Sequence, residues 1–377
     1  MDFEFSDEQR LLKDSVERLV ADRYAFESRK KYMTEPRGWS EEVWAQYAEL
    51  GLLGLPFAEE YGGFGGGPVE TMIVMEAFGR GLILEPYFAT VILGGGVLRH
   101  AASAAQRTVL LPQVAAGKLK LALAHVERHS RYDLANVTTI ARQNGDGWVL
   151  SGAKSVVLHG DCADKIIVSA RSVGSQCDRH GIGLFLVDAK DAGVVRQGYP
   201  TQDGLRAAEV TLTEALGEPI GDPTDGLPIL ERVIDEAIAA LAAEGVGIMA
   251  EMHDLTVEYL KTRQQFGRPI GQFQVLQHRS VDMFVALEQS RSITLYGTMM
   301  AGDDNTTERA RAMAATKVQI GRAGRHIGQE CVQLHGGIGM TAEYKAGHYF
   351  KRITMIDKMY GDADTQLAKL ARLGGIF

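Results

Sequence analysis

The apolar positions in the first part of the chain recur at helical spacing. In the first such segment they are Leu11, Leu12, Val16, Leu19 and Val20. Ser6, with Gln9 three residues later, forms a capping-box start for this helix. A second helix is expected to end at Gly51. We therefore expect residues 1–118 to form a helical N-terminal domain.

Between residues 119 and 225 the pattern changes to short β-rich runs separated by turn signals. The runs are 121–124, 138–142, 148–151, 166–170, 183–187 and 209–212. The segment from Asn144 to Gly147 is one of the turn signals, because Asn, Asp and Gly tolerate the backbone conformations of tight turns. Strands and turns in this alternation are typical of an all-β domain.

From residue 226 onward the pattern is helical again. Ala-rich stretches with periodic Leu, Met and Val cover 227–262, 273–301, 306–334 and 343–371. Each stretch is long enough for one helix of a bundle. The predicted domains are therefore 1–118, 119–225 and 226–377, in the order α–β–α, and the fold class is α+β.

Composition and charge narrow the classes of protein to which the chain can belong. Its 377 residues are 45% hydrophobic and 23% charged, which is ordinary for a globular protein of two or three domains. The net charge of −8 argues against nucleic acid as a partner, since Lys and Arg drive phosphate binding. No apolar run reaches the roughly 18 residues of a spanning helix, so no membrane span is expected.

The cysteines and the N-terminus both favour a cytoplasmic protein. Cys162, Cys177 and Cys331 are too widely spaced to predict a disulfide framework or a metal site. The N-terminal segment is acidic and lacks the apolar region of a secretory signal. It also lacks the Arg and Ser bias of a transit peptide.

A glycine-rich run at residues 59–67 has the composition of a phosphate-binding loop. However, no Lys-Ser or Lys-Thr pair follows it, and no predicted strand precedes it. We therefore interpret the run as a surface loop before a helix from Glu70 to Arg80.

Two motifs in the last third of the chain pair donor side chains with glycines. The first is 263–274, and the second is 333–340, which contains Gly336 and Gly337. The Arg and Gln side chains of these motifs are forked or planar donors, and glycine lets a backbone approach a bulky polar ligand closely. In this order and spacing the two motifs resemble the acyl-CoA dehydrogenase family, whose cofactor is FAD.

The resemblance covers essentially the whole chain. It implies a helical N-terminal domain, a central β-barrel-like domain and a C-terminal four-helix bundle. It also implies FAD contacts at His125, Val126, Leu158, Arg263, Phe266, Gln274, Gln333, Leu334, Gly336 and Gly337. In the family, the residues that resemble Arg263, Phe266 and Gln274 hold the FAD diphosphate and adenine of a neighbouring subunit, which implies an oligomer.

The family's reaction is the α,β-dehydrogenation of an acyl-CoA thioester, in which a carboxylate removes the α proton and the flavin accepts the β hydride. The family carries this Glu at one of two positions. Gly361 occupies the first of them here, and Ala237-Ile238 occupies the second. Glu244 lies two helical turns after Ala237 on the same helix face and is the candidate base. The alternative is that a neighbouring Arg or a helix end satisfies the Glu244 carboxylate.

Other polar residues near these positions have simpler expected roles. Asp362 and Asp364 are expected to cap a helix or stabilise a turn, and His335 is expected to pack beside the cofactor. The basic cluster from Arg128 to Arg131 is either near the CoA phosphates or flavin edge, or part of a solvated loop.

The flavin-facing positions also depart from the family pattern. The family's Thr-Glu-Pro turn is Val126-Glu127-Arg128 here, and Val156 and Leu158 replace a Trp and a Thr. Backbone groups at His125, Val126 and Leu158 are therefore expected to bond the flavin ring.

Three functional hypotheses follow from the resemblance. The segments around Gly361 and Glu244 resemble small subunits of heteromeric bacterial enzymes for dicarboxylyl (pimeloyl-type) or branched acyl-CoA substrates. The first hypothesis is a base-lacking subunit whose larger acyl-CoA dehydrogenase partner supplies the carboxylate. The second is a homo-oligomer that uses Glu244 or an Asp, and the third is a non-catalytic scaffold. An acceptor resembling electron-transferring flavoprotein is implied for an active enzyme.

Overall fold

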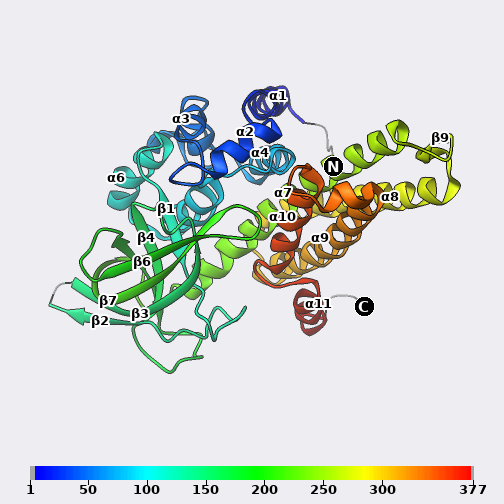
Figure 1. Ribbon diagram of the computed structural model, residues 1–377. Coiled ribbons are helices and arrows are strands. Elements are labelled where there is room, and N and C mark those ends of the chain that lie inside the picture. Colours follow the sequence, from blue (N-terminus) through cyan, green and yellow to red (C-terminus); the bar gives the residue numbers. More distant parts are fainter. Residues whose placement is uncertain (1–4, 146, 375–377) are drawn as a thin grey trace. The chain divides into compact units, whose positions relative to one another are not determined.

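A computed structural model of the chain describes residues 5–145 and 147–374 (Figure 1). The first four residues of the acidic N-terminal segment, and Asp146 of the predicted turn, lie outside the described residues. The contacts divide the chain into two compact units. The first unit contains Met1–Lys31, Gly67–Ile83 and Ile238–Phe377, and the second contains Tyr32–Gly66 and Leu84–Ala237.

The second unit is built on a seven-stranded sheet. Its strands are β1 (Leu121–Ala124), β2 (Ile140–Asn144), β3 (Gly147–Leu158), β4 (Lys165–Arg171), β5 (Ile182–Asp188), β6 (Val194–Pro200) and β7 (Arg206–Ile220). Strands β4, β2, β3, β7 and β5 pair in that order, and β5 pairs again with β4, so the ring of strands closes. Strand β1 pairs with β4, and β6 pairs with β7. The closed ring confirms the predicted barrel-like β domain.

Apolar side chains fill the ring. Strands β4 and β5 contain the apolar runs 166–168 and 184–187, and Ile166, Val168, Phe185 and Val187 are fully buried in one core cluster. Strand β6, at the edge of the sheet, alternates between half-buried and exposed residues. Because β6 contacts the sheet on one side only, its sequence lacks an apolar run, and the pattern of apolar positions did not predict it.

Short helices complete the second unit. They are α3 (Glu41–Glu49), η1 (Leu52–Gly54), η2 (Glu59–Tyr61), the π-helical η3 (Phe88–Gly94), α5 (Gly95–Ala101) and α6 (Ala104–Ala115). After η2, the backbone N–H groups of Gly63, Gly65 and Gly66 donate to the carbonyls of Ala58, Phe57 and Leu55. These N–H groups of the glycine-rich run are therefore paired with the backbone of the preceding segment, as expected for a structural loop.

The first unit is helical. Its elements are α1 (Asp7–Arg23), α4 (Pro68–Gly81), α8 (Gln274–Ala301), α9 (Thr306–His335), η5 (Gly336–Met340), α10 (Lys345–Lys358) and α11 (Ala363–Arg372). Helix α2 (Phe26–Met33) begins in this unit, and α7 (Leu227–Thr262) enters it at Ile238. The capping box of Ser6 and Gln9 is present at the start of α1. No described helix combines the length and the apolar character needed to cross a membrane.

Helix α9 is the centre of the C-terminal bundle, because α8, α10 and α11 each pack against it (Figure 1). The single helix predicted over 343–371 is wrong, since α10 and α11 are separate helices. The chain reverses between them through Tyr360 and Gly361, whose φ angles are +56° and +97°. Such positive φ values cannot continue a right-handed helix. Asp362 then caps α11 by accepting a hydrogen bond from the Thr365 N–H.

A close crossing of α4 and α7 determines where Glu244 lies. A Cβ added to Gly79 would lie 2.1 Å from the Glu244 carbonyl oxygen, and one added to Gly247 would lie 2.0 Å from the Glu76 carbonyl oxygen. Both positions must therefore be glycine for the backbones to approach this closely. The crossing holds the Glu244 backbone against α4 and limits where its side chain can reach.

Candidate active site

The motif at 263–274 forms a small exposed hairpin in the first unit. Strands β8 (Gln264–Gln265) and β9 (Arg268–Pro269) pair, and Phe266 and Gly267 form the turn at φ +56° and +76°. The Phe266 side chain is 88% exposed. The Phe266 ring meets the Phe273 ring edge-on at 6.0 Å between centroids, but most of its surface faces solvent, so the hairpin is suited to contact another molecule.

The polar side chains of this hairpin also face solvent. Arg263 is exposed, and its guanidinium has no ion pair or hydrogen-bond acceptor among the described residues. Gln274, the first residue of α8, is exposed as well. In contrast, the Arg268 guanidinium lies 4.2 Å from the centroid of the Phe273 ring, where it stacks. The Arg263 guanidinium and the Gln274 amide are therefore accessible to a ligand.

The motif at 333–340 leaves open space around its glycines. Gln333 is exposed, whereas Leu334 is buried and anchors the end of α9. Gly336 has φ +65°, and a Cβ added to Gly336 or Gly337 would meet no atom within 4 Å. Intramolecular packing therefore does not explain these glycines, and the open backbone fits the approach of a bulky polar ligand such as FAD.

The predicted flavin-ring residues lie together in the second unit. His125 and Val126 directly follow β1, and Leu158 is the last residue of β3. The Val126 carbonyl accepts a hydrogen bond from the Ser155 N–H at 2.9 Å, which joins the segment after β1 to β3. Burial, and then the charge of Lys154, lower the pKa of His125 to about 4, so this imidazole is neutral at pH 7.

A buried ion pair holds this segment in place. The Lys154 ammonium donates to Glu127 at 2.7 Å, and the Thr139 hydroxyl donates to the same carboxylate oxygen at 2.7 Å. Burial alone would raise the pKa of Glu127, but the Lys154 charge and the hydrogen bonds hold it at about 2. Glu127 is therefore an ionised structural residue that positions Val126 beside it.

Glu244, the predicted base, is buried and already paired. Arg352 of α10 donates from Nε to Oε1 at 2.6 Å and from Nη2 to Oε2 at 2.8 Å. This forked pair gives both carboxylate oxygens a charge-assisted hydrogen bond. The geometry matches the alternative of an Arg-satisfied carboxylate. The sequence analysis does not identify Arg352 as this partner. Its position among the buried residues of α10, three residues after Tyr349, is the feature of the sequence that could have indicated a buried cation.

The two positions that carry the family's Glu contain no carboxylate. Ala237 and Ile238 are buried apolar residues of α7. Gly361 has φ +97°, and a Cβ there would lie 2.8 Å from the Gln366 amide nitrogen. The buried Lys317 ammonium of α9 donates to the carbonyls of Ile356, Asp357 and Gly361 at 2.7, 2.9 and 3.0 Å. The turn is thus held by a fixed network that has no acid or base at position 361.

The nearby aspartates have the structural roles that were expected. The Asp362 carboxylate accepts from the Thr365 backbone N–H at 3.0 Å and from the Thr365 hydroxyl at 2.8 Å. The Thr365 hydrogen bonds lower the pKa of Asp362 to about 2. Asp364 is exposed in the first turn of α11, where a negative charge favours the helix dipole.

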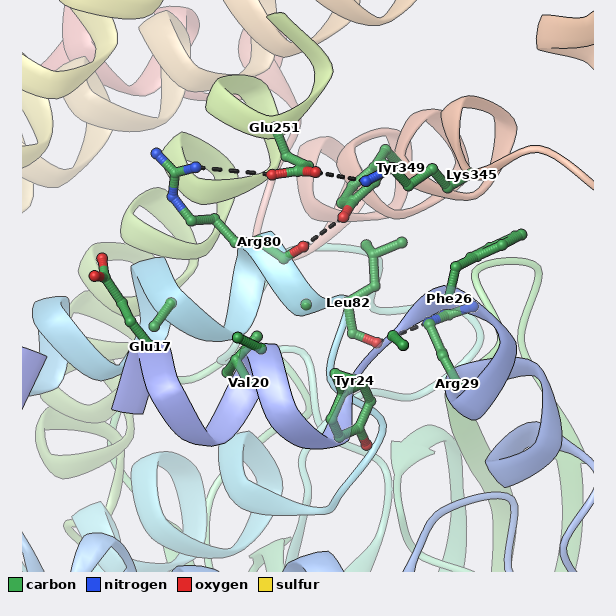
Figure 2. A pocket seen from close by; sticks show the side chains of 14 residues that line it. Glu17, Val20, Tyr24, Phe26, Arg29, Arg80, Leu82, Glu251, Lys345 and Tyr349 are labelled. Atoms are coloured by element: carbon green, nitrogen blue, oxygen red, sulfur yellow. Dashed lines mark hydrogen bonds and ion pairs between the residues drawn. The ribbon is translucent and has the colours of Figure 1, made fainter. Parts of the chain in front are cut away.

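A pocket of about 550 Å³ lies elsewhere in the first unit (Figure 2). Arg80 and Lys345 both lie against Glu251, with Nζ of Lys345 2.7 Å from the carboxylate, and the Tyr349 hydroxyl donates to the Arg80 carbonyl. None of the residues that line this pocket is a predicted FAD or base position. We therefore do not assign the reaction to it.

Three family models together match nearly the whole chain. They are Acyl-CoA dehydrogenase, N-terminal domain, over residues 6–118, the middle domain over 122–215 and the C-terminal domain over 224–374. The chain belongs to the acyl-CoA dehydrogenase family. It is therefore a flavoprotein oxidoreductase that acts on CH–CH groups, with FAD as its cofactor.

Three proteins illustrate the similarity over most of the chain's length. The probable acyl-CoA dehydrogenase YngJ of Bacillus subtilis is 26% identical over 99% of both chains. The caffeyl-CoA reductase-Etf complex subunit CarC of Acetobacterium woodii is 25% identical over 86% of this chain and 87% of its own. The solved Tcur3481-Tcur3483 steroid ACAD G363A variant is 30% identical, with a TM-score of 0.89 over 97% of both chains.

Proposed function

We propose that this acyl-CoA dehydrogenase is a base-lacking subunit that works in a heteromer with a base-carrying partner subunit. The observation that carries the proposal is the state of the candidate carboxylates. Gly361 and Ala237 replace the family's Glu, and Arg352 occupies both oxygens of Glu244. Without a positioned carboxylate, the substrate α proton has no acceptor but water, and general-base help is typically worth about 10²–10⁴ in rate.

The exposed segments of the first unit are proposed to hold FAD across a subunit interface. Bound FAD supplies the hydride acceptor of the reaction. Arg263 and Gln274 offer the forked and planar donors for the diphosphate and adenine, Phe266 offers an aromatic face, and Gly336 and Gly337 leave room for the ligand. Gln333 and Leu334 complete this cradle. In a single chain these segments are exposed to solvent, as expected if they reach the cofactor of a neighbouring subunit.

The flavin ring is proposed to contact the second unit. Backbone groups of His125, Val126 and Leu158 are the proposed hydrogen-bonding partners there. The proposed donors are the backbone N–H groups, because backbone carbonyls, such as that of Val126, which accepts from the Ser155 N–H, can only accept. The side-chain hydroxyl of the family's Thr is absent at Val126, so the ring polarisation here depends on the backbone alone.

The partner is proposed to dock on helix α8. Val281, Phe284, Val285, Tyr296 and Met299 are exposed along this helix at 58%, 49%, 48%, 42% and 41%. Large apolar side chains in a row on one helix mark an interaction surface. The similar Tcur3481-Tcur3483 protein is named for two components, which supports a second, related chain as the occupant.

The substrate is proposed to be a CoA thioester with a dicarboxylyl or branched acyl group. The steroid named for the Tcur3481-Tcur3483 protein supports a bulky, branched group over a short linear one.

The name of CarC, a subunit of an Etf complex, supports an acceptor that resembles electron-transferring flavoprotein. We propose the cytoplasm as the compartment, since Cys162, Cys177 and Cys331 are all free thiols.

Anaerobic mixing with acyl-CoA thioesters tests the proposal. The chain alone and the chain co-expressed with a homologous large subunit are each mixed with a medium-chain, a branched and a dicarboxylyl-CoA, and loss of visible flavin absorbance is followed. We expect slow or no reduction by the chain alone and rapid reduction by the co-expressed complex. Rapid reduction by the chain alone that is abolished in a folded, flavin-containing Glu244→Gln variant would overturn the proposal and make Glu244 the base. A purified complex with no flavin spectrum would support the scaffold hypothesis.

A further inference from the structure

His335 lies at the joint between the two segments that are proposed to hold FAD. It is buried, with 3% of its surface exposed, and is the last residue of α9, directly before Gly336. The His335 ring lies 4.6 Å from the Tyr259 ring of α7 and 5.0 Å from the Tyr344 ring, measured between centroids. Three separate parts of the first unit therefore meet at one imidazole.

Hydrogen bonds determine the tautomer of this imidazole. Nδ1 of His335 lies 2.7 Å from the Cys331 carbonyl oxygen, which can only accept, so Nδ1 carries the proton. Nε2 is then a lone-pair acceptor, and the Tyr344 hydroxyl at 3.1 Å donates to it. In this neutral tautomer both ring nitrogens have a hydrogen-bond partner.

The three aromatic residues connect directly to the FAD segments. The Arg263 N–H donates to the Tyr259 carbonyl at 2.8 Å, so Tyr259 precedes the exposed hairpin by one helical turn. The backbone of His335 continues into Gly336, whose positive φ begins the open loop. Tyr344 is the residue at which α10 starts, on the far side of that loop. Fixing His335 against Tyr259 and Tyr344 therefore fixes the hairpin and both ends of the glycine loop relative to each other.

We propose that His335, with Tyr259 and Tyr344, is a positioning cluster that holds the Arg263 hairpin and the Gly336-Gly337 loop at the spacing required for FAD. The inference rests on the proposed FAD contacts of these segments. None of the three residues needs to touch the cofactor. Their effect on FAD affinity is through preorganisation, since a loop held in its bound conformation loses less entropy on binding.

The cluster also makes cofactor binding sensitive to pH. The titratable side chains facing His335 are Tyr259 of α7, Tyr344 before α10 and Cys331 of its own helix. None of them is an anion at neutral pH that would stabilise an imidazolium. Protonation of Nε2 would remove the acceptor for the Tyr344 hydroxyl. Burial holds the pKa of His335 below its ordinary value of 6.5, so this loss occurs in acid.

FAD titration of flavin-stripped, full-length protein in its native assembly tests the proposal with three variants. Tyr344→Phe removes only the hydroxyl that donates to His335. Tyr349→Phe is the matched control, since Tyr349 also donates one hydrogen bond, to the Arg80 carbonyl at the pocket in Figure 2. Arg263→Ala reports on the proposed FAD contact itself. The dissociation constant of FAD and the Tm of the stripped protein are measured for each.

We expect Tyr344→Phe to weaken FAD binding by about 3- to 10-fold, the value of one hydrogen bond, while Tyr349→Phe leaves the FAD Kd unchanged. Equal weakening in both phenylalanine variants would show general loosening and overturn the positioning role. An unchanged Kd in Tyr344→Phe alongside weak binding in Arg263→Ala would also overturn it. An unchanged Kd in both Tyr344→Phe and Arg263→Ala would overturn the proposed FAD contacts instead.

The pH profile gives a second readout that a purely structural role would not change. His335→Gln places an amide oxygen near the Nε2 position, which keeps an acceptor for Tyr344 but cannot titrate. We expect the FAD affinity of the wild type to fall as the pH drops below 6.5, the ordinary histidine value. The affinity of His335→Gln should change less over the same range. Identical pH profiles of the two proteins would overturn the pH-dependent part of the proposal.

Discussion

At the scale of single residues, buried charges decide which carboxylates can take part in chemistry. Glu127 and Glu244 are both buried and both paired with a cation, Lys154 or Arg352. A buried pair contributes little net stability when intact, but removal of one partner leaves an uncompensated charge. Substitution of either glutamate is therefore expected to lower the stability of the protein before any effect on proton transfer is seen.

Loss of the Arg352 partner should destabilise the protein strongly. Arg352→Met leaves the Glu244 carboxylate buried without its two hydrogen bonds, so we expect a loss of about 3–5 kcal/mol in unfolding free energy. The double variant Arg352→Met with Glu244→Leu should recover part of this loss, because the charge is gone as well. Thermal and urea unfolding measure both. A single variant as stable as the wild type would contradict the buried pair.

The Glu127 carboxylate should contribute a stability that depends on pH. Its pKa falls from 4.5 to about 2 on folding, so the contribution is present above pH 4.5 and is lost as the pH falls from 4.5 toward 2. Glu127→Gln should therefore be much less stable than the wild type at pH 6, and the difference should narrow in this acid range. The Tm of both proteins across pH measures it, and a constant difference would argue against an ionised Glu127.

Loss of the Arg263 side chain should remove FAD from the protein. The exposed guanidinium is proposed to make charge-assisted hydrogen bonds to the diphosphate, each worth about 1.5–3 kcal/mol. Arg263→Ala should therefore be purified with a markedly lower ratio of flavin absorbance to protein absorbance. Arg268→Ala is a useful comparison, because Arg268 stacks on Phe273 within the same hairpin. Full flavin content in Arg263→Ala would show that the segment does not hold FAD.

At the scale of elements, the apolar periodicity predicted most helices and strands but not the turns that place the site. The runs at 166–170 and 183–187 lie within β4 and β5, where every residue of the two runs is buried and all but Ser169 are apolar. The edge strand β6 and the hairpin of β8 and β9 were not predicted, because exposed residues carry no such pattern. The break between α10 and α11 depends on the positive φ of both Tyr360 and Gly361, of which only the glycine is a turn signal in the sequence.

The α10–α11 turn explains why a glutamate cannot simply be restored at position 361. Gly361→Glu would force an L side chain into φ +97° and place its Cβ 2.8 Å from the Gln366 amide, which strains the backbone by about 1–3 kcal/mol. We expect this variant to be less stable and to show no gain in flavin reduction by acyl-CoA. Anaerobic mixing checks the second point. Rapid reduction by Gly361→Glu would mean that the turn adapts and that the position remains catalytic.

At the scale of the whole molecule, the resemblance of the entire chain to the acyl-CoA dehydrogenase family predicted the fold and the cofactor. Residues that a second chain contributes to a site cannot be predicted from this sequence alone. The order of helical, β and helical parts and the motifs at 263–274 and 333–340 sufficed for the family. We propose that its domains divide after residues 118 and 225. The pairing of Glu244 with Arg352 required the structure, because the two residues are 108 positions apart in the sequence.

The central claim is that the α-proton acceptor comes from a partner subunit. The most direct measurement is the rate of flavin reduction after anaerobic mixing of acyl-CoA with two complexes. One complex carries Glu244→Gln in this chain, and the other carries a Glu→Gln change in the partner, at the position aligned with Ala237 here. The account predicts that the partner's change slows reduction by about 10²–10⁴, while Glu244→Gln in a folded complex does not. The opposite result, slow reduction only with Glu244→Gln, would contradict it.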